Sequence, residues 1–263
     1  MTYKRHWDDS VEGISHIYSY DSSACHTMQV DGLKLSIGKT YKSETGEEEY
    51  ALIILGGTCD VTGDGFSYLS AGVRKNVFDG KCTAIYLPRR KSFKVAALTD
   101  LRMIIARCPS DTDYEPAIVK PEDVVVKKLG KPGFEREAHF ILDERVNASR
   151  IYLGENFICG GQWSSFPGHR HDRNNYPNEV FSEEIYYFEY DKAGGYGIQQ
   201  VYTDDRMIDE AYPVRQGDIV EIPRGYHPCT VAPGYTGYLL WLMSCDKRGF
   251  CFSTDPEQAW QIK

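Results

Sequence analysis

Hydrophobic and polar residues alternate along most of this chain in short runs, and turn-forming residues separate one run from the next. A period of two is typical of β-strands, because successive side chains of a strand point to opposite faces. Helical periodicity is almost absent, apart from one helical turn predicted over Asp255–Trp260. Many short strands bounded by Gly, Pro, Asp and Asn predict an all-β fold built as a sandwich or as barrels.

The predicted strands fall into two groups. Those of the first half are Thr27–Ile37, Tyr50–Leu55, Ala84–Tyr86, Phe93–Ala97 and Arg102–Arg107. Those of the second half are His139–Leu142, Ile151–Cys159, Ile185–Tyr190, Tyr196–Tyr202, Asp218–Ile222 and Thr236–Ser244. Polar, turn-rich stretches over Cys108–Pro116 and Lys127–Gly133 read as connecting segments between the two groups. We therefore predict two domains, residues 1–115 and 116–263.

Composition and charge narrow the classes of partner. The chain has 263 residues, 41% of them hydrophobic, and a formal net charge of −8. The negative charge argues against a nucleic-acid partner, and no stretch approaches the roughly 20 apolar residues of a membrane span. Eight cysteines occur without any Cys-x-x-Cys, and the N-terminus has no secretory signal pattern. We therefore expect reduced thiols and a cytoplasmic protein.

The candidate chemistry lies in the second half. His169 and His171 stand two residues apart, so in a strand they point to the same face and can reach one ion together. Glu184 opens a strand-like run, and its neighbour Glu183 points to the opposite face. His227 follows a Pro-x-Gly turn that could return a fourth ligand to the same place. Three imidazoles and one carboxylate in this arrangement predict a metal site.

The first half of the chain has a similar pattern of strands and turns but lacks these ligands. Glu49 followed by a strand and Gly56 resembles Glu184 and its strand, but no histidine pair precedes Glu49. Arg89–Phe93 stands where His227 would be. The pattern indicates a duplicated domain whose N-terminal copy has no metal ligands, although chance similarity would also produce it.

The spacing Gly217, five residues, Pro223-x-Gly225-x-His227, preceded by His-x-His and Glu, resembles the two motifs of the cupin superfamily. Twelve residues separate His171 from Glu184, a longer gap than is usual in cupins. Together with the segments Trp163–Asp172, Glu183–Tyr187, Gln200–Arg206 and Gly225–Pro228, this gap resembles the 5-deoxy-glucuronate isomerase family of bacterial myo-inositol catabolism. That family is a bicupin related to the 5-keto-4-deoxyuronate isomerases. The resemblance covers most of the chain.

The resemblance implies two tandem cupin barrels of the double-stranded β-helix or jelly-roll type. It implies a metal-dependent aldose–ketose isomerase, an intramolecular oxidoreductase that converts 5-deoxy-D-glucuronate to 2-deoxy-5-keto-D-gluconate. The implied ligands of one divalent transition metal ion (Zn, Mn, Fe, Co or Ni) are His169, His171, Glu184 and His227. The expected partner is a small anionic sugar acid, and by analogy we expect a homo-oligomer.

Two alternatives stay open from the sequence. A cupin dioxygenase would use the same ligands, and a non-catalytic sugar-binding or regulatory bicupin would keep the metal without turnover. Phe188 keeps the second alternative open, because the family usually carries a histidine at this position. Met243 is followed by Ser-Cys-Asp-Lys, which also departs from the family pattern.

An isomerase needs a group that moves a proton between adjacent carbons. The candidates by residue type are Glu183, Asp172, Asp205 and a tyrosine such as Tyr187 or Tyr202. Counting by two from Glu184 favours Tyr186 over Tyr187 as the tyrosine that faces the metal, provided the strand has no bulge.

The substrate carboxylate needs a guanidinium or an ammonium group. Arg173, in the gap between the ligands, and Arg206 are the first candidates. Arg170 lies between two ligands and is expected to face away from the metal. The gap itself, residues 172–183, is expected to form either a loop over the mouth of the cavity or a passive hairpin.

Overall fold

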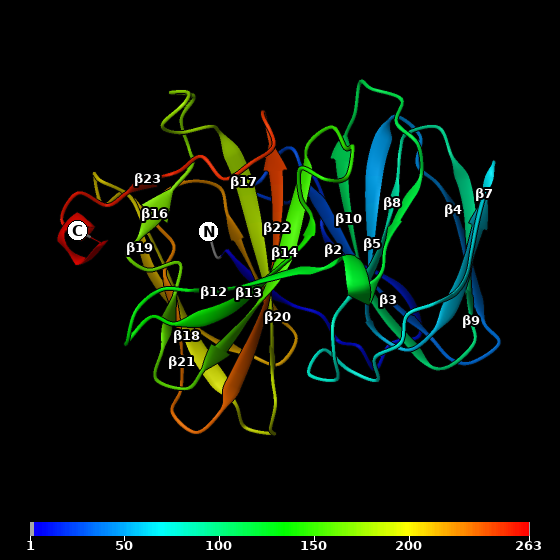
Figure 1. Ribbon diagram of the computed structural model, residues 1–263, viewed down its shortest axis with the longest axis horizontal. Helices are drawn as coiled ribbons and strands as arrows, with labels where there is room; N and C mark the ends of the chain where they lie inside the picture. Colours follow the sequence, from blue (N-terminus) through cyan, green and yellow to red (C-terminus); the bar gives the residue numbers. More distant parts are fainter. Residues whose placement is uncertain (1–2, 263) are drawn as a thin grey trace.

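Two β-barrels lie side by side along the long axis of the molecule in the computed structural model, which describes residues 3–262 (Figure 1). The N-terminal barrel contains β2 (Gly13–Tyr18), β3 (Gln29–Leu35), β4 (Thr40–Glu44), β5 (Glu48–Gly56), β6 (Cys59–Gly63), β7 (Phe66–Ala71), β8 (Thr83–Leu87), β9 (Ser92–Ala97), β10 (Leu101–Pro109) and β11 (Ala117–Val119). A short 3-10 helix, η1 (Pro121–Asp123), connects it to the second barrel. No helix among these described residues is long and apolar enough to cross a membrane.

The C-terminal barrel takes its strands from the rest of the chain and from the extreme N-terminus. Its strands are β1 (Lys4–His6), β12 (Val125–Leu129), β13 (Arg136–Leu142), β14 (Ile151–Cys159), β15 (Trp163–Ser164), β16 (His169–Arg170), β17 (Ser182–Tyr190), β18 (Tyr196–Tyr202), β19 (Asp209–Arg215), β20 (Asp218–Ile222), β21 (Cys229–Val231), β22 (Thr236–Cys245) and β23 (Ser253–Thr254). A 3-10 helix, η2 (Ala259–Ile262), follows β23.

Each barrel combines one large sheet with smaller ones. The N-terminal barrel has sheets of order β11-β8-β5-β10-β3-β2 and β4-β9-β6-β7. The C-terminal barrel has the order β1-β20-β17-β22-β14-β13-β12, with β15-β21-β18-β19 and β16-β23 opposite. The predicted boundary at residue 115 falls just before β11, which still pairs with β8 of the N-terminal barrel. In the other direction, β1 pairs with β20, so the first strand belongs to the second barrel (Figure 1).

The two large sheets pack face to face, so their central strands are buried on both sides. Along β5, Tyr50, Leu52 and Ile54 point into the N-terminal barrel, whereas Ala51 and Ile53 belong to the apolar cluster between the barrels. The same cluster takes Ile185 and Tyr187 from β17 and Leu240 and Leu242 from β22. Burial on both faces explains why these strands read as continuous apolar runs rather than as strict alternation.

Buried charges also join the barrels. Arg74 of the N-terminal barrel pairs with Glu155 of β14 through two hydrogen bonds of 3.1 and 2.5 Å, and the Tyr238 hydroxyl donates to the same carboxylate. Glu49 accepts hydrogen bonds from the backbone N–H groups of Ser149, Arg150 and Ile151. Glu49 therefore fixes the relative position of the barrels, a different task from that of Glu184.

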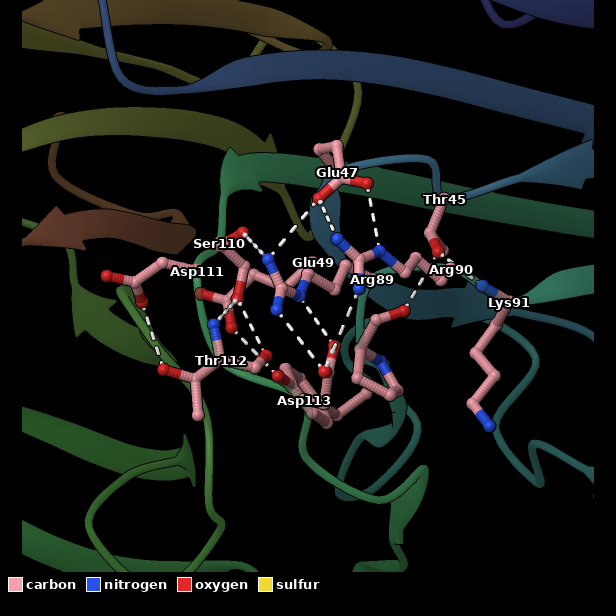
Figure 2. A network of polar contacts seen from close by, with 12 residues as sticks. Thr45, Glu47, Glu49, Arg89, Arg90, Lys91, Ser110, Asp111, Thr112 and Asp113 are labelled. Carbon is pink, nitrogen blue, oxygen red and sulfur yellow. Dashed lines mark hydrogen bonds and ion pairs between the residues drawn. The ribbon is translucent and has the colours of Figure 1, made fainter.

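The interior of the N-terminal barrel is filled by apolar side chains, among them Leu33, Leu52, Ile85 and Met103. In the turn after β8, where the C-terminal barrel carries a histidine, the chain has two arginines (Figure 2). Arg89 hydrogen-bonds Asp113 at 2.5 Å, and Arg90 hydrogen-bonds Glu47 at 2.9 Å. These arginines tie three loops together, and neither is available as a metal ligand.

All of the predicted strands are present, but the structure also contains strands that were not predicted. Each of the eleven predicted strands coincides with or overlaps an observed one. The prediction of a connecting segment over Lys127–Gly133 was wrong in part, because Val125–Leu129 forms the edge strand β12. An exposed edge strand needs no apolar face, so its polar sequence resembles a loop. The helical turn of the C-terminal segment begins at Ala259, later than predicted.

Candidate metal centre and cavity

Three histidines converge inside the C-terminal barrel. His169 and Arg170 form β16, which pairs with β23, and His171 follows directly. The ring of His227 lies 4.8 Å from that of His169 and 5.0 Å from that of His171, measured between centroids. One nitrogen atom from each of the three lies within 4.8 Å of the other two.

Local backbone geometry returns His227 to this place. Gly225 has φ +92°, and a Cβ atom there would lie 2.4 Å from the carbonyl oxygen of Tyr202. Only glycine fits this turn without displacing the neighbouring strand. The Gly225 carbonyl oxygen lies 2.9 Å from Nδ1 of His227, and the Ser182 carbonyl oxygen lies 2.7 Å from Nδ1 of His171. These carbonyls hold the proton on Nδ1 of each ring and direct the Nε2 lone pairs inward.

Glu184 completes the group on β17. Its Oε2 atom lies 3.0 Å from Nε2 of both His171 and His227. Burial alone would raise the pKa of Glu184, but the neighbouring His171 and His227 outweigh it and lower this pKa to about 2. Glu184 is therefore a carboxylate at neutral pH.

The donor set fits a cation. With Nδ1 of His227 bound to a carbonyl, its Nε2 atom is buried without a hydrogen-bond partner and faces the Glu184 carboxylate. Two lone pairs facing each other at 3.0 Å repel unless a positive charge lies nearby. Burial, together with His227 and His171, lowers the pKa of the half-buried His169 well below 6.5, so this ring is neutral. Burial lowers the pKa of His171, but the hydrogen bond and the charge of Glu184 outweigh it and raise this pKa. Neutral imidazoles and a carboxylate are the forms that bind a divalent ion, so an ion would displace a proton shared by His171 and Glu184.

A cavity of about 210 Å³ opens beside His169 and Glu184. Liquid water occupies about 30 Å³ per molecule, so this space matches about seven waters, the size of a small sugar acid. Its polar lining comes from Arg136, Asn156, Ser165, His169, Glu184 and Tyr186, and its apolar lining from Leu129, Ala138, Phe140, Trp241, Phe250 and Phe252.

The candidates for proton transfer lie in three different places. Tyr186 lines the cavity, and its hydroxyl lies 2.7 Å from that of Ser165. Glu183 lies on the opposite face of β17, where its carboxylate accepts hydrogen bonds from the backbone of His26 and Thr27. Asp205 lies in an exposed turn and accepts from the Thr203 hydroxyl. Of Tyr186, Glu183 and Asp205, the structure therefore brings only Tyr186 to the histidines.

The two arginines predicted from the sequence lie on the surface. The side chain of Arg173 is 60% exposed and bonds Asp204 at 3.2 Å. The side chain of Arg206 is 50% exposed and lies over the ring of Tyr202. Neither is among the residues that line the cavity. Arg136 lines it instead, and the parity of β13 would have pointed to it had the strand been predicted from residue 136 rather than from His139.

The long gap between His171 and Glu184 packs against the C-terminal segment. The Asn174 side chain donates to Asp246 at 2.9 Å, and the Val180 N–H donates to the Cys251 carbonyl at 3.1 Å. No residue of the gap lines the cavity, whereas Phe250 and Phe252 of the C-terminal segment do. Among the described residues, the gap thus supports the segment that borders the cavity.

Comparison with solved structures defines the class of this protein. Over 97% of this chain and 88% of the other, it superimposes on the oxalate decarboxylase of Lactobacillus farciminis with a TM-score of 0.67 at 12% identity. An IolB-like protein from Salmonella typhimurium LT2 matches over the full length of both chains, with a TM-score of 0.95 at 28% identity. The fold is therefore a pair of tandem cupin barrels, as predicted.

Sequence comparison defines the family. The model of the KduI/IolB family matches residues 4–261, and the chain belongs to this family. The 5-deoxy-glucuronate isomerase of Geobacillus thermodenitrificans is 37% identical over 230 residues, which are 87% of this chain and 84% of the relative. The 5-deoxy-glucuronate isomerase of Bacillus subtilis strain 168 is 35% identical over 252 residues, 95% of this chain and 93% of the relative. The resemblance seen in the motifs is thereby confirmed.

Proposed function

We propose that this chain is a 5-deoxy-glucuronate isomerase that produces 2-deoxy-5-keto-D-gluconate. The observation that carries the proposal is the convergence of three histidines and Glu184 on a cavity of sugar-acid size, in a chain that shares 35 to 37% identity with such isomerases over most of its length. In this reaction the hydrogen at C2 of the aldehyde sugar moves to C1, and the proton of the C2 hydroxyl moves to the C1 oxygen. No external oxidant is needed.

The proposed ligands of one divalent transition ion are His169, His171, His227 and Glu184. Four ligands leave coordination positions open for substrate. When bound, the ion would act as a Lewis acid that stabilises negative charge on the two substrate oxygens. The carbonyl groups of Ser182 and Gly225 keep two of the imidazoles in the orientation that this role requires.

Tyr186 is the proposed proton donor to the substrate. Burial, with a further contribution from Glu184, raises the pKa of Tyr186 well above 10, so its hydroxyl keeps its proton at neutral pH. The bond to Ser165 holds that proton at the cavity wall. Apart from Glu184, no carboxylate lines the cavity within the described part of the chain. We therefore assign proton donation to Tyr186, with Ser165 as its partner; because Tyr186 keeps its own proton, removal of the C2 hydrogen requires a different group.

Phe188 stands where the family usually has a histidine, but this position does not belong to the cavity wall. Phe188 is buried in the apolar cluster of the C-terminal barrel, its ring centroid 6.2 Å from that of Tyr186. It is absent from the cavity lining. This placement favours the isomerase over a binding protein that has lost its chemistry.

The expected homo-oligomer and the cytoplasmic location stay proposals. The exposed valines Val125 and Val126 on the edge strand β12 support self-association, because an unpaired edge can add another strand. Light scattering coupled to gel filtration would measure the mass in solution, and cell fractionation would test the location.

The decisive experiment is incubation of metal-assayed protein with 5-deoxy-glucuronate in D₂O, followed by NMR. The expected product carries solvent deuterium on the carbon next to its new carbonyl group. A chelator-treated sample serves as control. Absence of turnover with every divalent ion tested would overturn the proposal, and consumption of O₂ would favour a dioxygenase instead.

A further inference from the structure

Arg136 lines both the cavity and a crevice on the outside of the barrel. It is the first residue of β13 and shares a strand face with Ala138 and Phe140, which also line the cavity. Arg136 and Leu129 also border a crevice of about 1020 Å³ outside the barrel. The arginine therefore stands between the solvent and the space that contains His169 and Glu184.

The guanidinium of Arg136 has almost no partners. Among residues 3–262 its only hydrogen bond, to the Phe134 carbonyl, is long at 3.4 Å, and its buried Nε atom has no partner. No carboxylate within residues 3–262 lies at ion-pair distance from it. By contrast, the buried Arg74 pairs with Glu155 at 2.5 Å, and the half-buried Arg102 and Arg107 pair with Glu189 at 2.9 Å and with Asp31 at 3.1 Å.

An unpaired charge in an apolar wall is unfavourable. Burial lowers the pKa of Arg136 below its ordinary value, with Tyr186 and Cys229 opposing the shift. A guanidinium nevertheless stays protonated in proteins, so the positive charge remains. A carboxylate brought in by a ligand would offset it and would satisfy the free N–H groups as a bidentate pair.

We propose that Arg136 binds the carboxylate of the substrate and sets the preference for sugar acids over neutral sugars. The inference rests on the proposed function. The aldehyde and its neighbouring hydroxyl belong at the histidines, and the carboxylate lies at the other end of the six-carbon chain. Arg136, His169 and Glu184 line one cavity, so a single sugar acid can meet both ends of it.

The test compares Arg136→Gln with the wild type on two substrates, 5-deoxy-glucuronate and its neutral analogue 5-deoxy-glucose. Loss of one partner of a buried charge pair should lower kcat/KM for the acid about 100-fold, mainly through KM. The value for the neutral analogue should change by less than about threefold, and Arg136→Lys should recover part of the loss. Arg215→Gln, an exposed arginine on β19, serves as matched control.

Metal content and thermal midpoint show whether each variant is folded. An unchanged preference for the acid in Arg136→Gln would overturn the inference, as would loss of that preference in Arg173→Gln or Arg206→Gln instead. Calorimetric titration with D-gluconate and with sorbitol needs no turnover, and it separates this inference from the proposed function. Gluconate should bind the wild type at least tenfold tighter than Arg136→Gln, and sorbitol should bind both equally. Equal gluconate binding by both proteins, or by neither, would contradict the role of Arg136.

Discussion

Asp172 Oδ2 accepts a hydrogen bond of 2.8 Å from the backbone N–H of Gly225. Asp172 directly follows His171, and Gly225 lies two residues before His227. One hydrogen bond therefore joins the two segments that carry these histidines, which are far apart in the sequence. Groups that orient ligands in this way are as much a part of a metal site as the ligands themselves.

Replacing Asp172 by Ala should weaken binding of a divalent ion by about 10- to 100-fold, because the turn that carries His227 loses its anchor. Asp172→Asn should keep most of the affinity, since its amide oxygen can accept the same hydrogen bond. Competition with a chromophoric chelator measures both affinities. Equal loss in the two variants would show that the negative charge near Arg170 matters more than the bond to Gly225.

Neighbouring glutamates on β17 should respond in opposite ways. Glu184→Gln should lose stoichiometric metal, measured by elemental analysis, because a neutral amide is a poor ligand. Glu183→Gln should retain the metal but lose about 2–4 kcal/mol of unfolding free energy, because its carboxylate accepts three hydrogen bonds from His26 and Thr27. Urea denaturation of the metal-free proteins measures that loss. Full metal content in Glu184→Gln and in the alanine variants of all three histidines would remove the basis for a metal centre.

The buried pair between Arg74 and Glu155 should stabilise the contact between the barrels. The side chains of both residues are almost completely buried, so Arg74→Met leaves a carboxylate without its counter-charge. We expect a loss of about 3–5 kcal/mol in unfolding free energy. Adding Glu155→Leu should recover part of this loss, because no unpaired charge then remains. Denaturation of the four proteins of this double-mutant cycle checks the expectation, and additive losses would contradict it.

Local rules were enough to predict one side of the site. Alternation along a strand places Glu184 and Tyr186 on one face, and both border the cavity. The spacing of His169 and His171 likewise predicted that their rings would lie near each other, and their centroids are 6.3 Å apart. The approach of His227 could be predicted only through the resemblance of its turn to a known motif, because it depends on pairing between distant strands.

The arginine of the cavity could not be predicted in this way. Arg173 and Arg206 were chosen because they lie near the ligands in the sequence, but the loops that contain them place both on the surface. Arg136 enters the cavity because β13 pairs with β14 within the large sheet of the C-terminal barrel. That pairing joins segments whose order in the sheet no local pattern specifies. Cavity residues that come from strands paired in this way can be identified only from the folded structure.

Two adjacent tyrosines of β17 allow the proposed chemistry to be tested against a matched control. Tyr186 faces the cavity and bonds Ser165, whereas Tyr187 faces the other barrel and donates to Glu189 at 2.6 Å. Tyr186→Phe should lower kcat by about 100-fold or more, with metal content and KM little changed, because a positioned proton donor is lost. Tyr187→Phe should keep kcat and lose about 1–2 kcal/mol of stability, since its buried hydroxyl bond is removed.

The rate of 5-deoxy-glucuronate turnover and the uptake of solvent deuterium, both followed by NMR, measure the first effect. Ser165→Ala should show a smaller decrease, because Tyr186 keeps its hydroxyl but loses the bond that orients it. If Tyr186→Phe turned over at the wild-type rate, the proton would have to pass through another group. The other acidic or basic side chains of the cavity wall are Glu184, His169 and Arg136, and one of these would then have to transfer the proton. A fall in kcat for Tyr187→Phe but not for Tyr186→Phe would show that transmitted strain, rather than proton transfer, controls the rate.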